Sequence, residues 1–384
     1  MFARRLPCPR SSFFLLGARG TGKTTWIQQN FPDAHHYDLL LTSESLRLSR
    51  DPGLLRNECL ALEDGAWIVL DEVQRVPELL DEVQHLMAKK KQRFVLSGSS
   101  ARKLRRSSTN LLAGRAAMRQ MFPLVSAEVA GDRPLDRVLG EGMLPLAVTG
   151  EDPRAFLRSY CELYLREEIQ AEALVRQIGP FHRFLEVAAR MNAQTVNVTG
   201  VARDAGIARQ TTHEFFQILV DTLLATWLPA WKLKRAVKQV AHPKFFLFDT
   251  GVVRHLAGTA HHLVHPEERG FLLETFLLHE LRAWLHYSGN EFPLAYWRTH
   301  DGAEVDFVIE LAEGLLAIEV KSADQWDRRW NHGLTKLREL QPRLRTKTIG
   351  VYTGSRAMLL DDVRILPWQE FLTSLWDGTL CKLD

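Results

Sequence analysis

The strongest chemical pattern in the chain lies at residues 17–24, whose letters are GARGTGKT. They fit the pattern G-x-x-x-x-G-K-[ST], in which glycines let the backbone wrap around phosphate groups with its N–H groups pointing inward. We expect Lys23 to reach the β- and γ-phosphates of ATP and Thr24 to place its hydroxyl on Mg²⁺. The residues expected to bind the nucleotide are Gly17, Ala18, Arg19, Gly20, Thr21, Gly22, Lys23, Thr24 and Thr25.

Two carboxylates follow an apolar segment about fifty residues after this loop. Residues 67–70 predict a buried strand, and Asp71 and Glu72 come directly after it. In a nucleotide hydrolase, Asp71 would hold Mg²⁺ through water and Glu72 would polarise the attacking water. Solvated acids are the ordinary explanation of such a pair alone, but its place after a phosphate-binding loop favours catalysis.

Two further segments are candidates for parts of the same site. Residues 93–96 predict a third strand that ends in the hydroxyl-rich segment 97–100, where Ser97 could sense the γ-phosphate. A plain turn explains that segment nearly as well. Arg115 could supply positive charge to the ATP of a neighbouring subunit, and an ordinary surface arginine is the alternative.

The elements around the glycine loop predict an α/β fold. Residues 13–16 are wholly apolar, as in a strand covered on both faces, and residues 25–30 predict the opening of a helix. The basic residues before this strand resemble the start of a signal peptide, but the apolar part is too short for one. The helix N-terminus adds a favourable dipole for phosphate.

Composition sets limits on the protein class. The chain has 384 residues, 46% of them hydrophobic, and a net charge of +3, so we expect two or three domains and no charge-driven partner from composition alone. No apolar run approaches the ~20 residues of a membrane helix. The four cysteines are scattered without zinc spacing. We therefore expect a cytoplasmic protein without membrane, haem, flavin or zinc.

The middle of the chain contains a helix-turn-helix pattern. Apolar spacing predicts helices in residues 151–190, and residues 200–205 and 208–220 form a helix pair around Gly206, with Thr199 as the expected N-cap. Basic residues between 227 and 248 could form a hairpin or wing. The pattern favours DNA contact and packing as an ordinary protein module about equally. The possible DNA contacts are Arg209, Gln210, Thr211, Thr212, Lys232, Lys234 and Arg235.

The C-terminal third carries a second set of carboxylates. Residues 304–310 and 315–321 predict paired strands, with Asp306 on the first and Glu319 and Lys321 on one face of the second. Two carboxylates and a lysine can bind Mg²⁺ and activate water for attack on a phosphodiester. A helix at residues 271–287 could add Glu274 or Glu280 as a ligand. Salt-bridged strand ends are the alternative explanation.

Taken together, these ordered segments resemble a known fusion, that of the AAA-type ATPases of the AAA_14 class with a DUF4143 C-terminal region. The segments that carry the resemblance are GARGTGKTT (17–25), VLDEVQRVPELL (69–80), LSGSSARKLRR (96–106), LLAGR (111–115), YLREEIQAEALVR (164–176), PKFFLFDTGVVRHL (243–256), LLETFLLHELRAWL (272–285), YWRT (296–299) and AEVDFVIE with LAIEVKS (303–322).

The resemblance implies three parts: an AAA+-like P-loop ATPase core at 1–130, a helical and winged-helix-like region at 131–240, and a domain similar to the PD-(D/E)xK nuclease fold at 241–384. It places Lys23, Thr24, Asp71 and Glu72 at the ATPase positions, Ser97 or Ser99 at the sensor and Arg115 at a possible finger. It also matches Asp306, Glu319 and Lys321 to the nuclease motif, with Glu280 as the helix acid.

Three functions follow as hypotheses. The first is a Mg²⁺-dependent ATPase that acts on DNA as a homo-oligomer, plausibly a hexamer, with basic clusters at 89–93 and 102–106 as possible phosphate contacts. The second is an ATP-dependent switch with little turnover, which regulates a partner. The third is a Mg²⁺-dependent nuclease licensed by ATP.

Overall fold

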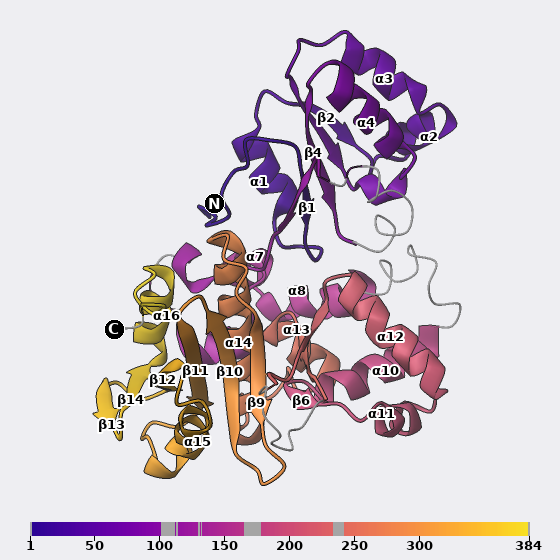
Figure 1. Cartoon of the computed structure of the whole chain (residues 1–384). Coiled ribbons are helices and arrows are strands. Elements are labelled where there is room, and N and C mark those ends of the chain that lie inside the picture. The colour runs from indigo at the N-terminus through magenta and orange to yellow at the C-terminus, as the bar shows by residue number, and fades with distance from the viewer. Residues whose placement is uncertain are drawn as a thin grey trace. The chain divides into compact units, whose positions relative to one another are not determined.

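A computed structural model of the chain describes residues 2–100, 112, 114–129, 131, 133–164, 178–232 and 242–382. The chain forms two compact units, one of residues 4–123 and 219–224, the other of residues 1–3, 124–218 and 225–384 (Figure 1). The expected three-part division at 130 and 240 stays a prediction. None of the described helices combines the length and the apolar character needed to cross a bilayer.

The first unit is a parallel sheet with helices on both faces (Figure 1). The strand order is β2-β3-β4-β1-β5, and every neighbouring pair is parallel. The three predicted strands are confirmed, and the third continues two residues further than expected, to Gly98. The elements are β1 (Phe13–Leu16), α1 (Lys23–Asn30), β2 (His35–Asp38), α2 (Thr42–Arg50), α3 (Gly53–Leu60), β3 (Trp67–Asp71), α4 (Leu79–Lys89), β4 (Arg93–Gly98) and β5 (Ala117–Gln120).

Strand β1 explains how the sheet fixes the glycine loop. Its side chains alternate between faces, so Phe14 and Leu16 join the apolar cluster under α2–α4, while the ring of Phe13 lies 6.2 Å from that of Trp26 in α1. Burying such a side chain stabilises the fold by about 1.5–3 kcal/mol. With β1 packed on both faces and paired to β4 and β5, the loop after it starts from a rigid point.

The second unit begins with helices and a small sheet of order β6-β8-β7. The predicted helix pair is present, and Gly206 ends the first helix in the left-handed conformation. Thr199 is not the N-cap, because the side chain of Asn197 accepts hydrogen bonds from the N–H groups of Thr199 and Gly200. The elements are α6 (Leu135–Glu141), α7 (Pro145–Thr149), α8 (Pro153–Ser159), α10 (Ile178–Arg190), β6 (Gln194–Thr195), α11 (Val198–Ala205), α12 (Arg209–Asp221), β7 (Ala225–Leu228), β8 (Lys244–Leu247) and α13 (Thr250–Ala257).

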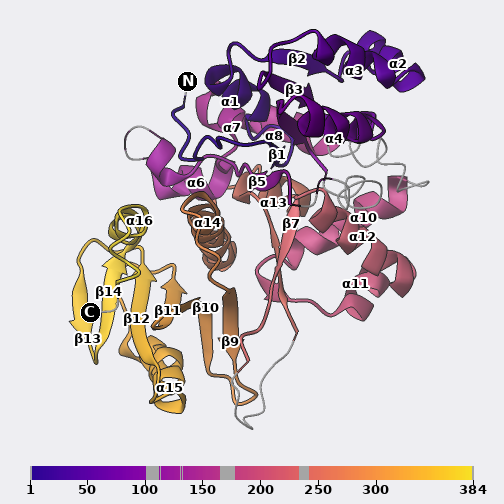
Figure 2. The ribbon, with the colours of Figure 1, turned by 45° about the horizontal axis from the view of Figure 1, so that its top comes forward.

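The rest of the second unit is a mixed six-stranded sheet of order β13-β14-β12-β11-β10-β9 (Figure 2). The predicted paired strands are confirmed as β10 and β11, which are antiparallel and joined by a tight turn. Helix α14 packs on β11, and α15 packs on β10, β11 and β12. The elements are α14 (Pro266–Tyr287), β9 (Leu294–Arg298), β10 (Glu304–Leu311), β11 (Gly314–Lys321), α15 (His332–Leu340), β12 (Arg345–Tyr352), β13 (Met358–Leu360), β14 (Val363–Pro367) and α16 (Trp368–Trp376).

Candidate functional site

The loop between β1 and α1 has the backbone shape of a phosphate cradle. Gly20 and Gly22 have φ angles of 81° and 92°, which side-chain-bearing residues adopt only with strain. Gly22 is the N-cap of α1, so the first free N–H groups of that helix open toward the loop. The loop is therefore shaped to present backbone N–H groups to an anion.

Two basic side chains donate hydrogen bonds to carbonyls of this loop. The ammonium of Lys23 is buried and donates to the carbonyls of Gly17, at 2.8 Å, and Ala18, at 3.4 Å. The guanidinium of Arg4 donates to the carbonyl of Thr21 at 2.6 Å and to that of Phe122 at 2.6 Å. Arg4 was not predicted from the sequence. It ties the loop to the segment after β5.

The expected magnesium residues lie together at the carboxyl ends of the strands. The hydroxyl of Thr24 donates to Oδ2 of Asp71 at 2.8 Å, which joins the start of α1 to the end of β3. Ser97, in β4, donates to Oδ1 of the same carboxylate and accepts from the backbone N–H of Glu72 at 3.2 Å. The hydroxyl of Thr24 and the carboxylate of Asp71 form an all-oxygen donor set, which fits Mg²⁺.

Glu72 is held in one orientation by uncharged groups. Its backbone has φ 60° and ψ 48°, a left-handed conformation that is rare for a glutamate and typical of functional sites. Its carboxylate accepts from the hydroxyl of Ser99 at 3.2 Å and from the amide of Gln74. Gln74 also donates to Ser99 at 3.1 Å. Both candidate sensor serines thus contact an acid at the end of β3.

The remaining residues predicted for this site differ in exposure. Thr25 is exposed on α1, and Arg19 is half-buried in the loop. Arg115 is exposed, and its backbone N–H closes a turn onto the carbonyl of Leu112. The structure therefore leaves the role of Arg115 as a prediction.

The candidate DNA contacts of the middle region divide by exposure. Arg209 and Gln210 are exposed at the start of α12, Thr211 is half-buried, and Lys232 is exposed. Thr212 is a wrong prediction, because its side chain is buried and its hydroxyl donates to the carbonyl of Ala208 at 3.0 Å. Lys234, Arg235 and the basic cluster at 102–106 lie outside the described residues.

The second unit brings the predicted C-terminal residues together at a cavity of about 520 Å³. Asp306 directly precedes Phe307, the first residue of β10 that pairs with β11, and lies where the pairing with β9 shifts register, an irregularity that often redirects a side chain at functional sites. Its Oδ2 accepts from the backbone N–H of Val320 at 2.9 Å. Lys321 donates to Oε1 of Glu319, so these two share a face of β11 as predicted.

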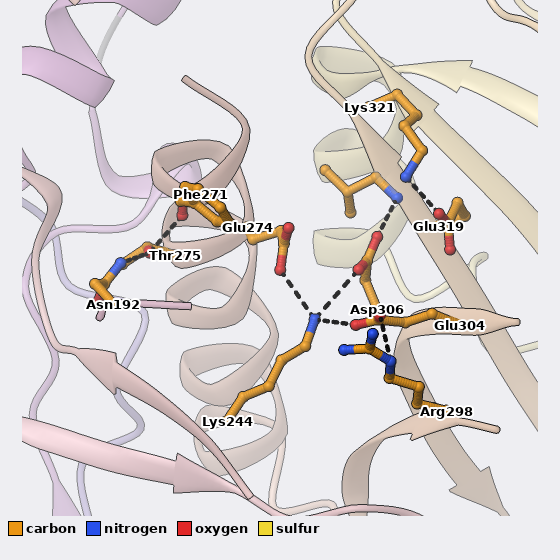
Figure 3. A network of polar contacts seen from close by, with 11 residues as sticks. Asn192, Lys244, Phe271, Glu274, Thr275, Arg298, Glu304, Asp306, Glu319 and Lys321 are labelled. Atoms are coloured by element: carbon orange, nitrogen blue, oxygen red, sulfur yellow. Dashed lines mark hydrogen bonds and ion pairs between the residues drawn. The ribbon is translucent and has the colours of Figure 1, made fainter. Parts of the chain in front are cut away.

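A lysine absent from the predicted set lies among three acids of this cavity (Figure 3). The ammonium of Lys244, in β8, is 2.7 Å from Glu304, 3.3 Å from Glu274 and 3.5 Å from Asp306. Burial opposes its charge, but Glu274 and the other two acids raise the pKa of Lys244 above its ordinary value. The arrangement is a buried lysine with three carboxylates around it.

Burial also affects the acids of this cavity. It raises the pKa of Glu274 to about 8, with repulsion from Asp306 adding to the effect and Lys244 opposing it. Burial and Asp306 raise the pKa of Glu319 well above its ordinary value, against the attraction of Lys321. Crowding of acids away from water disfavours their charged forms.

The helix acid of the cavity is Glu274, so the prediction of Glu280 as a ligand is wrong. Glu280 is fully buried elsewhere, where it accepts from the N–H and hydroxyl of Ser126 at 2.6 and 3.1 Å and from the indole N–H of Trp376 at 2.7 Å. The two glutamates are six residues apart and therefore point to different sides of α14. Glu280 has a structural role.

The predicted Mg²⁺ at Asp306 and Glu319 does not fit this cavity as it is arranged. Nowhere in the described ranges do three or more His, Cys, Asp or Glu side chains form a metal-binding group. Instead, Asp306 contacts Lys244 and the N–H of Val320, and Glu319 contacts Lys321. The ammonium groups of Lys244 and Lys321 thus contact the carboxylate oxygens that a metal ion would need as ligands.

Three family models match successive parts of the chain. Residues 9–130 match an AAA domain, AAA_14, residues 133–262 match a domain of unknown function, DUF8612, and residues 269–371 match another, DUF4143. Two curated proteins, Mb2031c of Mycobacterium bovis and Rv2008c of Mycobacterium tuberculosis, are each 27% identical over 373 residues, which is 94% of this chain and 80% of theirs. Both are described as uncharacterized.

Similarity to solved structures is weak. A STAND protein with a tetratricopeptide repeat sensor from Pyrococcus horikoshii has a TM-score of 0.21 at 14% identity, over 74% of this chain and 48% of that one. Can2 from Sulfobacillus thermosulfidooxidans, in complex with cyclic tetra-adenylate, has a TM-score of 0.22 at 10% identity, over 97% of this chain and 100% of that one. At these scores the likeness supports no conclusion about function.

Proposed function

Because this chain joins an AAA_14 domain to a DUF4143 region, we propose that it is a Mg²⁺-dependent ATPase that acts on DNA as a homo-oligomer. The observation that carries ATP hydrolysis is the hydrogen-bonded chain from Thr24 to Asp71 to Ser97. It joins the start of α1 to the ends of β3 and β4. In parallel α/β sheets, that edge is where ligands bind.

Each residue of the site has a distinct task in this proposal. Lys23 and the loop N–H groups bind the β- and γ-phosphates and hold them in line for attack. Glu72 accepts a hydrogen bond from the attacking water and orients it, while Ser99 and Gln74 keep its carboxylate in place. Thr24 and Asp71 would hold Mg²⁺, which when bound neutralises negative charge on the phosphates.

DNA is the proposed partner because of the middle region. Helices α11 and α12 are joined by a glycine turn, and the second begins with exposed Arg209 and Gln210, as in a winged-helix domain. The C-terminal sheet with Asp306, Glu319 and Lys321 resembles the PD-(D/E)xK fold, which would give a second surface for the strand. An assembly of subunits with Arg115 acting on a neighbour's ATP completes the proposal.

The test is the steady-state rate of ATP hydrolysis with Mg²⁺, measured alone and with single-stranded, duplex and branched DNA at stated salt concentrations. We expect hydrolysis to rise several-fold with DNA. We also expect Lys23→Ala and Glu72→Gln to lower kcat by about 100-fold or more, as loss of one transition-state contact does. Glu78→Gln is the matched control, because Glu78 is exposed a short distance along the same segment.

Other outcomes separate the competing functions. Slow turnover that ignores every DNA would favour the ATP-dependent switch. A purified protein that retains no nucleotide with Mg²⁺ present would refute all of the ATP-based functions. For the oligomer, native mass spectrometry with a non-hydrolysed ATP analogue should show assembly, and mixing Arg115→Ala with Glu72→Gln subunits should restore part of the activity if Arg115 acts in trans.

A further inference from the structure

The C-terminal cavity holds its own cation. The side chain of Lys244 is only 6% exposed, and its ammonium lies among carboxylates from two different elements, Glu274 of α14 and Glu304 and Asp306 of β10 (Figure 3). Three acidic groups around one point are the usual surroundings of a divalent metal ion. Here a lysine nitrogen occupies that point.

Lys244 is fixed in this position by the strand that carries it. Strand β8 is the middle strand of its sheet, and Lys244 is paired with Thr195 on one side and Leu228 on the other. Its ammonium also lies 5.3 Å from the centre of the Tyr296 ring, within range of a cation–π interaction. The hydroxyl of Tyr296 in turn donates to the carbonyl of His242. The lysine is therefore part of the packed interior.

The carboxylate oxygens that a metal would need are mostly engaged. Asp306 uses Oδ1 for Lys244 and Oδ2 for the N–H of Val320. Glu319 uses Oε1 for Lys321, and its buried Oε2 has no hydrogen-bond partner. These two acids together leave one oxygen without a partner, whereas Mg²⁺ requires six oxygen ligands at about 2.0–2.1 Å, several of them water. A second cation beside Lys244 would also be repelled.

We propose that the ammonium of Lys244 is the resident cation of this cluster, that it excludes a divalent metal ion, and that the cavity holds the phosphate backbone of a DNA strand without cleaving it. The first two statements stand on the cavity alone, and the third rests on the proposed action on DNA.

The charge of the cavity supports a phosphate ligand. Four acids and four lysine or arginine side chains line it, together with His332, and without Lys244 these acids would outnumber those cations and repel phosphate; the eight are Glu274, Glu304, Asp306, Glu319, Lys244, Arg298, Lys321 and Arg329, of which Arg329 is paired with Asp327. The side chain of Arg298 is 41% exposed and contacts Glu304 through Nε, at 3.5 Å, while that of Lys321 is 29% exposed. Trp330 and Phe271 also line the cavity and offer aromatic surface for a base.

The metal statement is tested by titrating Mn²⁺ into the full chain without nucleotide and following the free Mn²⁺ signal by electron paramagnetic resonance. We expect the wild type and Lys244→Arg, which keeps the charge, to show no Mn²⁺ binding that depends on Asp306. Lys244→Gln should gain one Mn²⁺ ion, lose it again in Lys244→Gln/Asp306→Asn, and have its Tm raised by Mn²⁺. Mn²⁺ bound at the glycine loop should be unaffected by Asp306→Asn, so this variant distinguishes it from Mn²⁺ bound in the cavity.

Two results would overturn the proposal. The first is a wild type that binds Mn²⁺ and loses this binding in Asp306→Asn. The second is a folded Lys244→Gln that gains no Mn²⁺. If Lys244→Gln does not fold, Mn²⁺ binding by the wild type, Lys244→Arg and Asp306→Asn still tests the proposal, because all three keep the positive charge at position 244.

The DNA statement is tested with end-labelled single-stranded DNA and Mg²⁺ or Mn²⁺. We expect intact DNA after incubation, and we expect Arg298→Gln and Lys321→Gln each to lower the salt dependence of binding by about one phosphate contact. Cleavage that Asp306→Asn abolishes would refute it. Unchanged salt dependence in both variants would refute the backbone contact. If the ATPase proposal is wrong, the result is different: the wild type shows no ATP turnover, while the Mn²⁺ measurements are unchanged.

Discussion

The glycine-loop site and the C-terminal cavity both combine acids with a buried lysine, but they use the lysine differently. At the loop, Asp71 and Glu72 accept hydrogen bonds from hydroxyl and amide groups, while Lys23 donates to backbone carbonyls. In the cavity, the acids contact the ammonium of Lys244 directly.

This difference decides what each site can bind. Uncharged donors orient a carboxylate and leave its charge available for a metal ion, whereas an ammonium neutralises the charge in place. Lys23, which has no carboxylate partner in the described contacts, keeps its charge for phosphate. The first site can thus accept an external cation and an external anion together, whereas in the second the carboxylate charges are already neutralised by an ammonium of the protein.

The largest expected effect compares the two lysines directly through protein stability. Lys244→Met should lower the free energy of unfolding by about 3–5 kcal/mol, because it leaves buried carboxylates without their cation. Lys23→Met should lower it by only about 1–2 kcal/mol, because it removes hydrogen bonds to carbonyls. Urea unfolding followed by tryptophan fluorescence measures both. Equal losses would show that the two lysines do not differ as described.

A second prediction concerns pH and uses Glu280 of α14. Burial raises the pKa of Glu280 from 4.5 to about 7, although its hydrogen bonds to Trp376 and Ser126 act against the shift. Between these values the folded protein holds a proton that the unfolded chain has lost, so stability falls as pH rises from 4.5 to 7. The slope from this one group is up to about 1.4 kcal/mol per pH unit.

Glu280→Gln removes this titration and keeps the shape of the side chain. Other buried acids also titrate, so the quantity to measure is the difference in unfolding free energy between variant and wild type at several pH values. That difference should change between pH 4.5 and 7 and be constant above about 7. A difference that is constant throughout would mean that Glu280 is charged in the folded state.

The sequence predicted which residues lie together at the glycine loop because its information there is local. Residues 17–24 are contiguous, Asp71 ends β3, and Ser97 lies one residue before the end of the parallel strand β4, so the meeting of these residues at one edge follows from topology. Gln74 was not predicted, because the left-handed turn at Glu72 that brings it back to the acid has no clear signal in the sequence.

The cavity was predicted only in part because its residues come from distant segments. Lys244 precedes Asp306 by 62 residues and begins an apolar strand, where a lysine is usually a solvated strand end. Periodicity placed Glu274 and Glu280 on one helix but could not select between its sides without tertiary contacts. The N-cap at Asn197 instead of Thr199 shows the same limit, since element ends are the least certain feature of a sequence pattern.

A third prediction examines the uncharged support of Glu72. Gln74→Ala should lower kcat for ATP about tenfold, a change of about 1.4 kcal/mol in the barrier, with little change in nucleotide affinity. The reason is that Gln74 contacts Glu72 and Ser99 and is not predicted to contact the nucleotide. Gln74→Glu, which adds a charge, should lower kcat further. If Gln74→Ala instead raises KM at constant kcat, Gln74 supports nucleotide binding.

The smallest expected effect tests whether phosphate is bound outside the glycine loop at all. Arg209→Gln should weaken binding to any DNA sequence and lower the slope of log affinity against log salt by about 1, because Arg209 is exposed at the start of α12 and available to one phosphate. Arg203→Gln is the matched control: Arg203 is also exposed, but it lies in the last turn of α11 and pairs with Asp204 at 3.0 Å. Equal slopes for both variants and the wild type would remove α12 from the DNA-binding surface and leave the cavity as the candidate.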